Sequence, residues 1–184
     1  MLIDAGCDSE DIKTISSFIR ENNITVKGIL LTHGHYDHII SIDELKKLLS
    51  ALVYSHEAEK VILEEPSLNL STRIGMNIMF TPDKLFNDGD VFKLRSANLK
   101  VLHTPGHTTG GLCYYDEDNG VLFAGDTLFK DSIGRADLPS GSHSNLIRNI
   151  TERLFTLPGD TAVYPGHGPS TTIGYEKQHN PFVK

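Results

Sequence analysis

The stretch His33-Gly34-His35-Tyr36-Asp37-His38 places three imidazoles and one carboxylate within six residues. From composition alone, this spacing has a probability of about 0.002 in such a chain. Residues two apart in an extended chain point the same way, so His33 and His35 can bind one ion. Asp37 and His38 lie where the chain turns toward the next predicted helix, within reach of a second ion. The stretch therefore predicts a metal site.

Three further candidate ligands each follow a predicted strand and come directly after a glycine. They are His107, Asp126 and His167. Glycine permits close backbone approach and unusual dihedrals at the position before the ligand. Imidazole nitrogens and carboxylate oxygens suit zinc, iron(II) or manganese rather than the oxygen-only sites of calcium. Because one ion takes about four protein ligands, seven candidates predict two divalent ions.

The pattern of apolar residues predicts a mixed α/β architecture of layers around sheets. The helix expected over residues 9–22 has its apolar positions on one face, at Ile12, Ile15, Phe18 and Ile19. Residues 66–82 show no clear period and predict a surface loop that can cover a site. The other expected helices span residues 42–50, 57–63 and 144–155. The expected strands span residues 1–4, 26–31, 52–54, 91–95, 99–103, 112–115, 121–124 and 162–164.

Length and composition exclude several classes of protein. The chain has 184 residues, which predicts a single domain over residues 1–184. No apolar stretch approaches the roughly 18–20 residues that a membrane-spanning helix needs, and no signal peptide is expected. The net charge of -7 argues against a nucleic-acid partner. Only Cys7 and Cys113 are present, which indicates a reducing compartment, and we expect a cytoplasmic protein.

The string from His33 to His38, with His107, Asp126 and His167, resembles the metallo-β-lactamase superfamily. Other segments resemble its glyoxalase II group, the hydrolases of hydroxyacylglutathione thioesters. These segments are residues 105–108, 125–129, 134–139 and 165–174, followed by Glu176, Lys177 and residues 180–182. The resemblance covers nearly the whole chain.

This resemblance implies a four-layer αββα sandwich and a small-molecule thioester as substrate. It places His33, His35 and His107 on one ion. It places Asp37, His38 and His167 on the second, with Asp126 bridging the two. The ions are expected to be Zn²⁺, with iron or manganese as alternatives.

The chain departs from the family pattern because it lacks the usual N-terminal β-hairpin and so resembles an N-terminally truncated member. We therefore expect an exposed sheet edge that can support a homodimer. The larger glyoxalase II enzymes also carry a C-terminal helical region that helps to bind glutathione. The present chain ends soon after Phe182.

The expected mechanism uses the ions to lower the pKa of a shared water and to polarise the thioester carbonyl. Asp37 and Asp126 are the predicted catalytic residues, because as ligands they position the attacking water. Thr32, Thr104 and Thr127 lie next to predicted ligands and are candidates for orienting them. Arg135 is the candidate contact for carboxylates of the substrate.

Hydrolysis of a β-lactam or a lactone remains open within the hydrolase class, because the fold alone does not exclude it. Two functions of other classes also remain open. One is a persulfide (sulfur) dioxygenase that uses a single iron, since such enzymes resemble the same family and keep a similar Gly-Arg-x-Asp segment. The other is a metal-binding but inactive remnant. The remaining histidines, His56, His103, His143 and His179, fit no predicted ligand position and are expected to be structural or solvated. Cys113 is expected in the core and Cys7 in a loop.

Overall fold

The computed structural model describes residues 1–183. Within that range, no helix is both long enough and apolar enough to cross a membrane. The chain forms two compact units: residues 1–55 with 60–85, and residues 56–59 with the chain from Phe86 onward. The prediction of a single domain stays a prediction, because compactness does not show whether either unit folds alone.

The first unit is built on a four-stranded sheet with the order β1-β2-β3-β4. The strands are β1 (Leu2–Ile3), β2 (Gly28–Leu30), β3 (Leu52–His56) and β4 (Lys84–Phe86). β2 pairs in parallel with both β1 and β3, so the carboxyl ends of these three strands lie at one edge. That edge carries the loop with the predicted ligands, because His33 follows β2.

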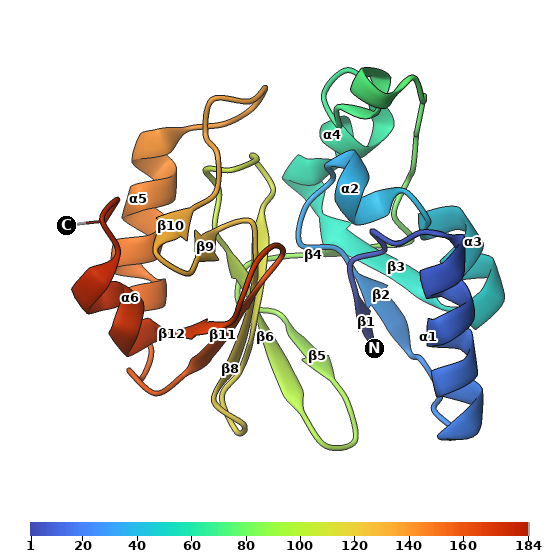
Figure 1. Ribbon diagram of the computed structural model, residues 1–184, viewed down its shortest axis with the longest axis horizontal. Coiled ribbons are helices and arrows are strands. Elements are labelled where there is room, and N and C mark those ends of the chain that lie inside the picture. The colour runs from blue at the N-terminus through green and yellow to red at the C-terminus, as the bar shows by residue number, and fades with distance from the viewer. Residues whose placement is uncertain (184) are drawn as a thin grey trace. The chain divides into compact units, whose positions relative to one another are not determined.

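Helices cover one face of this sheet, where α1 and α3 lie together in Figure 1. The unit as a whole contains the helices α1 (Ser9–Glu21), α2 (Tyr36–Ile39), α3 (Ile42–Leu49) and α4 (Lys60–Glu64) and the 3₁₀ turn η2 (Ser71–Ile74). The Asp8 carboxylate caps α1 by accepting from the main-chain N–H groups of Glu10 and Asp11. Ile12 of α1, Leu45 of α3 and Ile29 of β2 meet in the core.

The predicted buried face of the first helix is wrong at one position. Ile12 is buried, but Phe18 is 59% exposed. Ile15 and Ile19 are half-buried and lie within about 60° of Ile12 around the helix, whereas Phe18 lies about 120° away and so falls outside the packed face.

The second unit contains a six-stranded sheet with the order β12-β11-β8-β7-β6-β5. These strands are β5 (Val91–Lys93), β6 (Asn98–His103), β7 (Leu112–Asp116), β8 (Val121–Gly125), β11 (Ala162–Pro165) and β12 (Thr171–Thr172). A separate hairpin pairs β9 (Leu128–Phe129) with β10 (Ser132–Ile133). β5 to β8 form an antiparallel meander, whereas β11 joins β8 in parallel.

One face of this sheet packs against α5 and α6, which lie on the same side of it in Figure 1. The helices of this unit are η1 (Glu57–Glu59), α5 (His143–Glu152), η3 (Leu154–Thr156) and α6 (Ile173–His179). Leu146 and Ile150 of α5 pack in one cluster with Leu122, Val163 and Cys113. Cys113 is thus in the core, as predicted.

The mixed α/β class and most of the predicted elements are confirmed. The predicted helix over residues 57–63 begins as the 3₁₀ turn η1 and continues as α4. The sequence patterns missed α2, β4, the β9–β10 hairpin, β12 and α6. These elements have two to seven residues, too few for a periodic pattern to stand out. Glycine at position 174 further weakened the helical signal for α6.

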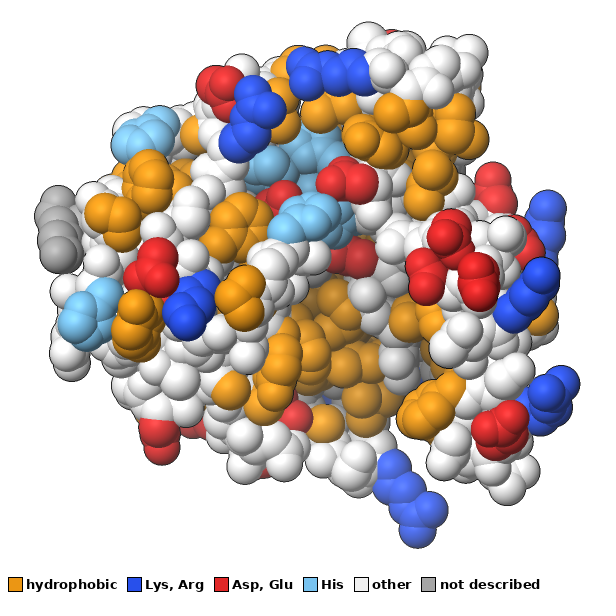
Figure 2. Space-filling view, viewed as in Figure 1, with side chains coloured by type: hydrophobic (Ala, Val, Ile, Leu, Met, Phe, Trp, Pro, Cys, Tyr) orange, Lys and Arg blue, Asp and Glu red, His pale blue; other side chains and the backbone are white. Residues whose placement is uncertain are grey.

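Basic side chains are dispersed over the surface that Figure 2 shows. Among the described residues on that face, lysines and arginines occur in several separate places, some of them in neighbouring pairs, and form no single continuous basic patch. This distribution agrees with the acidic net charge.

A buried glutamate fastens the last helix to the β9–β10 hairpin. Glu176 has no exposed surface. Its Oε2 accepts hydrogen bonds from the main-chain N–H of Asp131, at 3.0 Å, and from Asn180 Nδ2, at 2.8 Å. Asn180 Nδ2 also donates to the Ser132 carbonyl. The buried carboxylate thus has partners on both sides of the packing contact.

We expect Glu176→Ala to lower the free energy of unfolding by about 2–3 kcal/mol, because it leaves these donors without their acceptor. Urea denaturation monitored by circular dichroism measures the change. Gln178→Ala, at an exposed position of the same helix, is the control and should change stability by less than about 0.5 kcal/mol. Equal effects of the two substitutions would show that the network contributes nothing.

Candidate metal centre

The first unit presents its predicted ligands on the loop after β2 and on the short helix α2. His33 and His35 lie on the loop, and Asp37 and His38 lie on the helix. The His33 ring is 4.8 Å from the His35 ring and 4.0 Å from the His38 ring, measured between centroids. Three imidazoles that the sequence places within six residues therefore gather at one point of this unit.

Asp4, which the sequence analysis did not single out, orients this cluster. One carboxylate oxygen, Oδ1, accepts from the Thr32 main-chain N–H at 2.7 Å. The other, Oδ2, accepts from the Thr32 hydroxyl at 2.8 Å and lies 2.7 Å from His38 Nδ1. The pairing of β1 with β2 brings Asp4 beside Thr32. An acidic residue directly after a strand that pairs with β2 could therefore have been recognised in the sequence as a candidate partner for the ligand loop.

These contacts determine which ring nitrogens carry protons. A carboxylate can only accept, so His38 Nδ1 must donate to Asp4. The Thr32 hydroxyl gives its proton to Asp4 and therefore accepts from His33 Nδ1, which is 3.1 Å away. With the protons on Nδ1, both rings present the lone pair of Nε2 as a metal ligand.

The chain after Asp4 is packed directly against α2. The Ala5 N–H donates to the His38 carbonyl at 2.7 Å, and the Ser41 N–H donates to the Ala5 carbonyl at 3.0 Å. A Cβ added at Gly6 would lie 1.6 Å from the Asp37 carbonyl oxygen. Only glycine fits at position 6 without moving the helix that carries Asp37 and His38.

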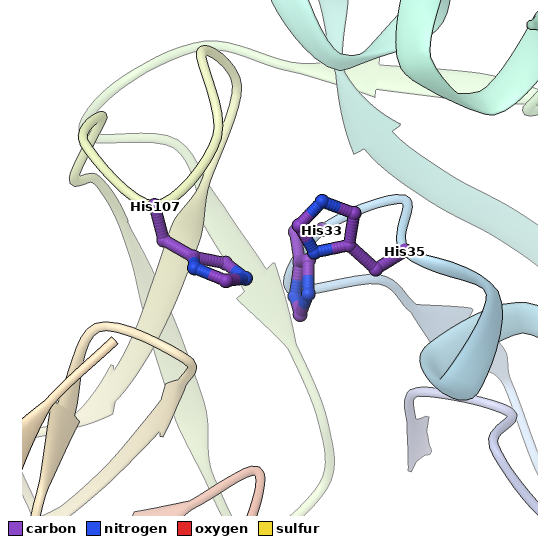
Figure 3. A group of neighbouring side chains, drawn as sticks. All are labelled: His33, His35 and His107. Carbon is purple, nitrogen blue, oxygen red and sulfur yellow. The ribbon is translucent and has the colours of Figure 1, made fainter. Parts of the chain in front are cut away.

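The second unit presents His107 on the loop that follows β6. Figure 3 shows the side chain of His107 on this loop, and those of His33 and His35 on the loop after β2. His107 Nδ1 is 2.6 Å from the main-chain carbonyl oxygen of Arg135. A carbonyl oxygen only accepts, so Nδ1 carries the proton and Nε2 is again the available ligand atom.

Asp126 and His167 lie at the ends of neighbouring parallel strands, β8 and β11. Pro165 of β11 pairs with Gly125 of β8, so the residues that follow both strands emerge at the same edge. Asp126 Oδ2 lies 3.7 Å from His107 Nε2 and also 3.7 Å from His167 Nε2. These separations are too long for hydrogen bonds.

The three atoms have the spacing of metal ligands. Bonds of about 2.0–2.2 Å at a tetrahedral angle separate two ligand atoms by roughly 3.3–3.5 Å. The two separations of 3.7 Å are slightly wider. The donor set of one carboxylate oxygen and two imidazole nitrogens therefore fits a divalent metal ion.

The segment that contains Arg135 contacts the predicted ligands His107 and Asp126 through its main chain. A Cβ added at Gly134 would lie 1.8 Å from the Asp126 carbonyl oxygen and 3.3 Å from His107 Nδ1. The Arg135 side chain is 65% exposed, and its guanidinium forms two hydrogen bonds with the Asp137 carboxylate. Its predicted contact with substrate stays a prediction, whereas its carbonyl demonstrably holds His107.

The three threonines that the sequence analysis proposed as orienting residues differ in what they contact. The Thr32 hydroxyl forms a hydrogen bond with the His33 ring. The hydroxyl oxygens of Thr104 and Thr127 lie 3.3 Å apart, and Thr104 Oγ1 is also 3.3 Å from Cys113 Sγ. These two residues therefore join the ends of β6 and β8 behind the ligand loops.

All seven predicted ligands are members of histidine and aspartate groups that could hold a metal ion. They are His33, His35, Asp37 and His38 in the first unit and His107, Asp126 and His167 in the second. Their donor atoms, imidazole nitrogen and carboxylate oxygen, are those of divalent transition-metal sites.

We expect Asp4→Asn to weaken zinc binding by about 10–100-fold. Both oxygens of Asp4 accept hydrogen bonds, whereas an amide has only one acceptor oxygen, so the variant cannot accept from the Thr32 main-chain N–H and from His38 Nδ1 at the same time. Competition with a chromophoric chelator measures the affinity. Asp43→Asn, at an exposed position of the same unit, is the control. An unchanged affinity in Asp4→Asn would show that the Asp4 carboxylate is not needed to orient His38.

We expect Gly134→Ala to lower zinc affinity by at least about tenfold, since the added methyl group displaces the main chain that holds Asp126 and His107. Arg135→Ala keeps the carbonyl that accepts from His107 and should leave the affinity unchanged. The same chelator competition compares the two variants. A similar loss in both would mean that the arginine side chain, rather than the main chain, supports the ligands.

Comparison with known proteins identifies the family. The model of the Metallo-beta-lactamase superfamily matches residues 1–167. Hydroxyacylglutathione hydrolase GloC of Haemophilus influenzae is 37% identical over 185 residues, covering 99% of this chain and 86% of that protein.

Solved structures agree. The BLEG-1 B3 metallo-beta-lactamase matches with a TM-score of 0.90 and 41% identity, over 98% of this chain and 87% of that one. TTHA1623 in a di-iron-bound form matches with a TM-score of 0.84 and 35% identity, over the same shares. The fold is therefore that of the metallo-β-lactamases, and the chain belongs to the metallo-β-lactamase superfamily.

Proposed function

We propose that this protein is a binuclear metal-dependent hydrolase that cleaves a thioester, with a hydroxyacylglutathione of the S-lactoylglutathione type as substrate. Membership of a superfamily of metallo-hydrolases supports the reaction class. We further propose Zn²⁺ as the metal, with iron or manganese as alternatives, and the di-iron form of TTHA1623 supports iron among these.

The observation that carries the proposal is the position of Asp126. Its Oδ2 lies 3.7 Å from Nε2 of both His107 and His167, which is close to the spacing of ligand atoms around an ion. With His107 and His167 assigned to different ions, Asp126 would be the ligand that the two ions share. We assign His33, His35 and His107 to one ion, and Asp37, His38 and His167 to the other. The seven His and Asp donors exceed the four or so that one ion takes, which supports two ions.

The residues of the chain prepare the site for hydrolysis. Divalent ions supply Lewis acidity, which lowers the pKa of water and polarises a carbonyl oxygen. Asp37 and Asp126 fix the position from which water attacks. Asp4 and the Arg135 carbonyl hold the imidazole protons on Nδ1, so that His38 and His107 keep their orientation.

The thioester substrate has support from one named relative. GloC carries the name hydroxyacylglutathione hydrolase and shares 37% identity over almost the whole of this chain. The Arg135 guanidinium, exposed on the loop whose carbonyl bonds to His107, is the proposed contact for carboxylates of glutathione. Its pairing with Asp137 means that a substrate carboxylate must compete with, or displace, that partner.

Hydrolysis of β-lactams is the second candidate, and one finding favours it. The BLEG-1 metallo-beta-lactamase shares 41% identity with this chain. A β-lactam and a thioester both present a carbonyl to the attacking water, so one donor set can serve either reaction. The substrate is therefore decided by groups around the ligands rather than by the ligands themselves.

We also propose a cytoplasmic location and a homodimer. Both Cys7 and Cys113 are free thiols, which suits a reducing compartment. Strand β1 is a terminal strand of the first unit's sheet, and an edge strand can pair with a second copy.

The proposal is tested with protein of measured metal content, assayed in parallel with S-D-lactoylglutathione, with a chromogenic β-lactam and for oxygen uptake with glutathione persulfide. We expect thioester turnover at two ions per chain and its loss on chelation. Asp126→Asn should lower kcat by at least about 100-fold, because the bridging charge is lost. The exposed Asp160→Asn is the matched control.

Each other outcome names a different function. One iron per chain with oxygen consumption would replace the hydrolase by a dioxygenase. Turnover of the β-lactam alone would replace the substrate. Metal-dependent thermal stability without turnover of any of the three substrates would favour an inactive metal-binding protein.

A further inference from the structure

A short segment of the second unit forms hydrogen bonds with the loop that carries His107. This segment, His56–Glu59, comprises the last residue of β3 and the turn η1. Glu59 has no exposed surface. Its Oε2 accepts hydrogen bonds from the Thr108 hydroxyl and from the Gly110 main-chain N–H, both at 2.8 Å. A single buried carboxylate oxygen thus binds the residues that follow the ligand.

Three further contacts join the same two segments. Thr109 Oγ1 donates to the Ala58 carbonyl at 3.1 Å. His103 Nε2 donates to the Thr109 carbonyl at 3.0 Å, and the His103 ring stacks on the His56 ring with centroids 3.9 Å apart. The His56–Glu59 segment therefore contacts both ends of the loop over residues 103–110.

The stacked ring of His56 must stay neutral in this arrangement. Its Nδ1 accepts from the Ala58 main-chain N–H at 3.1 Å, so this nitrogen carries no proton. Burial and the neighbouring His103 lower the pKa of His56, while Asp88 and Glu57 act in the opposite direction. The ring thus remains an acceptor and a flat surface for His103 near neutral pH.

Main-chain packing shows that the fit is close. A Cβ added at Gly110 would lie 2.3 Å from the Glu59 main-chain nitrogen. On the other side of the ligand, a Cβ added at Gly106, which has a φ of +149°, would lie 2.4 Å from Leu146 of α5. The Ser142 N–H also donates to the Gly106 carbonyl at 2.7 Å. His107 lies between two anchored stretches of main chain.

We propose that Glu59 is a positioning residue for His107, which holds residues 108–110 so that the imidazole meets its ion in a fixed orientation. The inference rests on the proposed function, in which His107 is a metal ligand. Glu59 is not one of the predicted ligands. It acts on His107 indirectly, by accepting hydrogen bonds from the residues that follow His107 in the chain.

If Glu59 had only a structural role, its variants would show a different pattern of stability and metal affinity. A glutamate that only stabilises the fold would, when removed, lower the melting temperature and leave the metal affinity of the folded protein unchanged. A positioning residue changes metal affinity even where the protein is folded. The two roles are therefore separated by measuring metal binding and stability in the same variants.

The first experiment compares Glu59→Ala, Glu59→Gln and Glu57→Ala in the whole 184-residue chain. Both donors reach the same oxygen of Glu59, so the carbonyl oxygen of glutamine can replace it. Glu57 lies in the same turn but is exposed, which makes it the matched control. Zn²⁺ affinity is measured by chelator competition, and the melting temperature is measured on metal-free protein.

We expect Glu59→Ala to weaken the binding of one zinc ion by at least about tenfold. Glu59→Gln should remain within about threefold of the unchanged protein, and Glu57→Ala should match it. The proposal is overturned if Glu59→Ala binds zinc as tightly as the unchanged protein, or if Glu59→Gln loses as much affinity as Glu59→Ala.

A second pair of variants covers the case in which Glu59→Ala does not fold. Thr108→Val removes the hydroxyl donor and keeps the shape, whereas Thr108→Ser keeps the donor. We expect Thr108→Val to weaken zinc binding severalfold and Thr108→Ser to restore it. Equal affinities in these two variants would overturn the proposal.

Zinc affinity is read without substrate, so the result does not depend on the reaction. If the unchanged protein binds two zinc ions but hydrolyses no thioester, the proposed function fails and the role of Glu59 is still decided by its variants. If the thioester is hydrolysed and Glu59→Ala keeps its zinc, only the role of Glu59 fails.

Discussion

The site depends on where the imidazole protons sit. An imidazole binds a metal only through a nitrogen without a proton, and its partner at the other nitrogen decides which one that is. Here the Asp4 carboxylate fixes the proton of His38 on Nδ1, the Thr32 hydroxyl does so for His33, and the Arg135 carbonyl does so for His107. The same atom, Nε2, is thereby left available in all three.

Two glycines allow the main chain to approach the ligand residues closely. Gly6 lets the chain after Asp4 lie against the Asp37 carbonyl, and Gly134 lets the main chain before Arg135 lie against Asp126. At both positions a methyl group would overlap a carbonyl oxygen, so the constraint is steric rather than conformational. The main chain can thus supply acceptors and rigid support without a side chain between it and the ligand.

Much of the fold and the donor set could be predicted because their signals are local. The three-and-four spacing in the first helix and the short apolar runs of β2 and β8 are visible within a few residues. So are the histidines and the aspartate between His33 and His38, and the glycine before His107, Asp126 and His167. Local signals failed for α6 and the β9–β10 hairpin, which are too short for a period. They also failed for Phe18, which lies about 120° around the helix from the buried Ile12 and outside the packed face.

The sequence by itself thus determined the family, the α/β class and the seven candidate ligands, since each of these follows from residue types at fixed spacings. Apart from Thr32, which directly precedes His33 in the sequence, only the tertiary structure decided which groups orient the ligands. Asp4 is 34 residues from His38, Arg135 is 28 residues from His107, and Glu59 is 49 residues from Thr108. Such pairs arise where strand ends and turns pack closely, often through main-chain atoms, and main-chain atoms are the same at every position of a sequence.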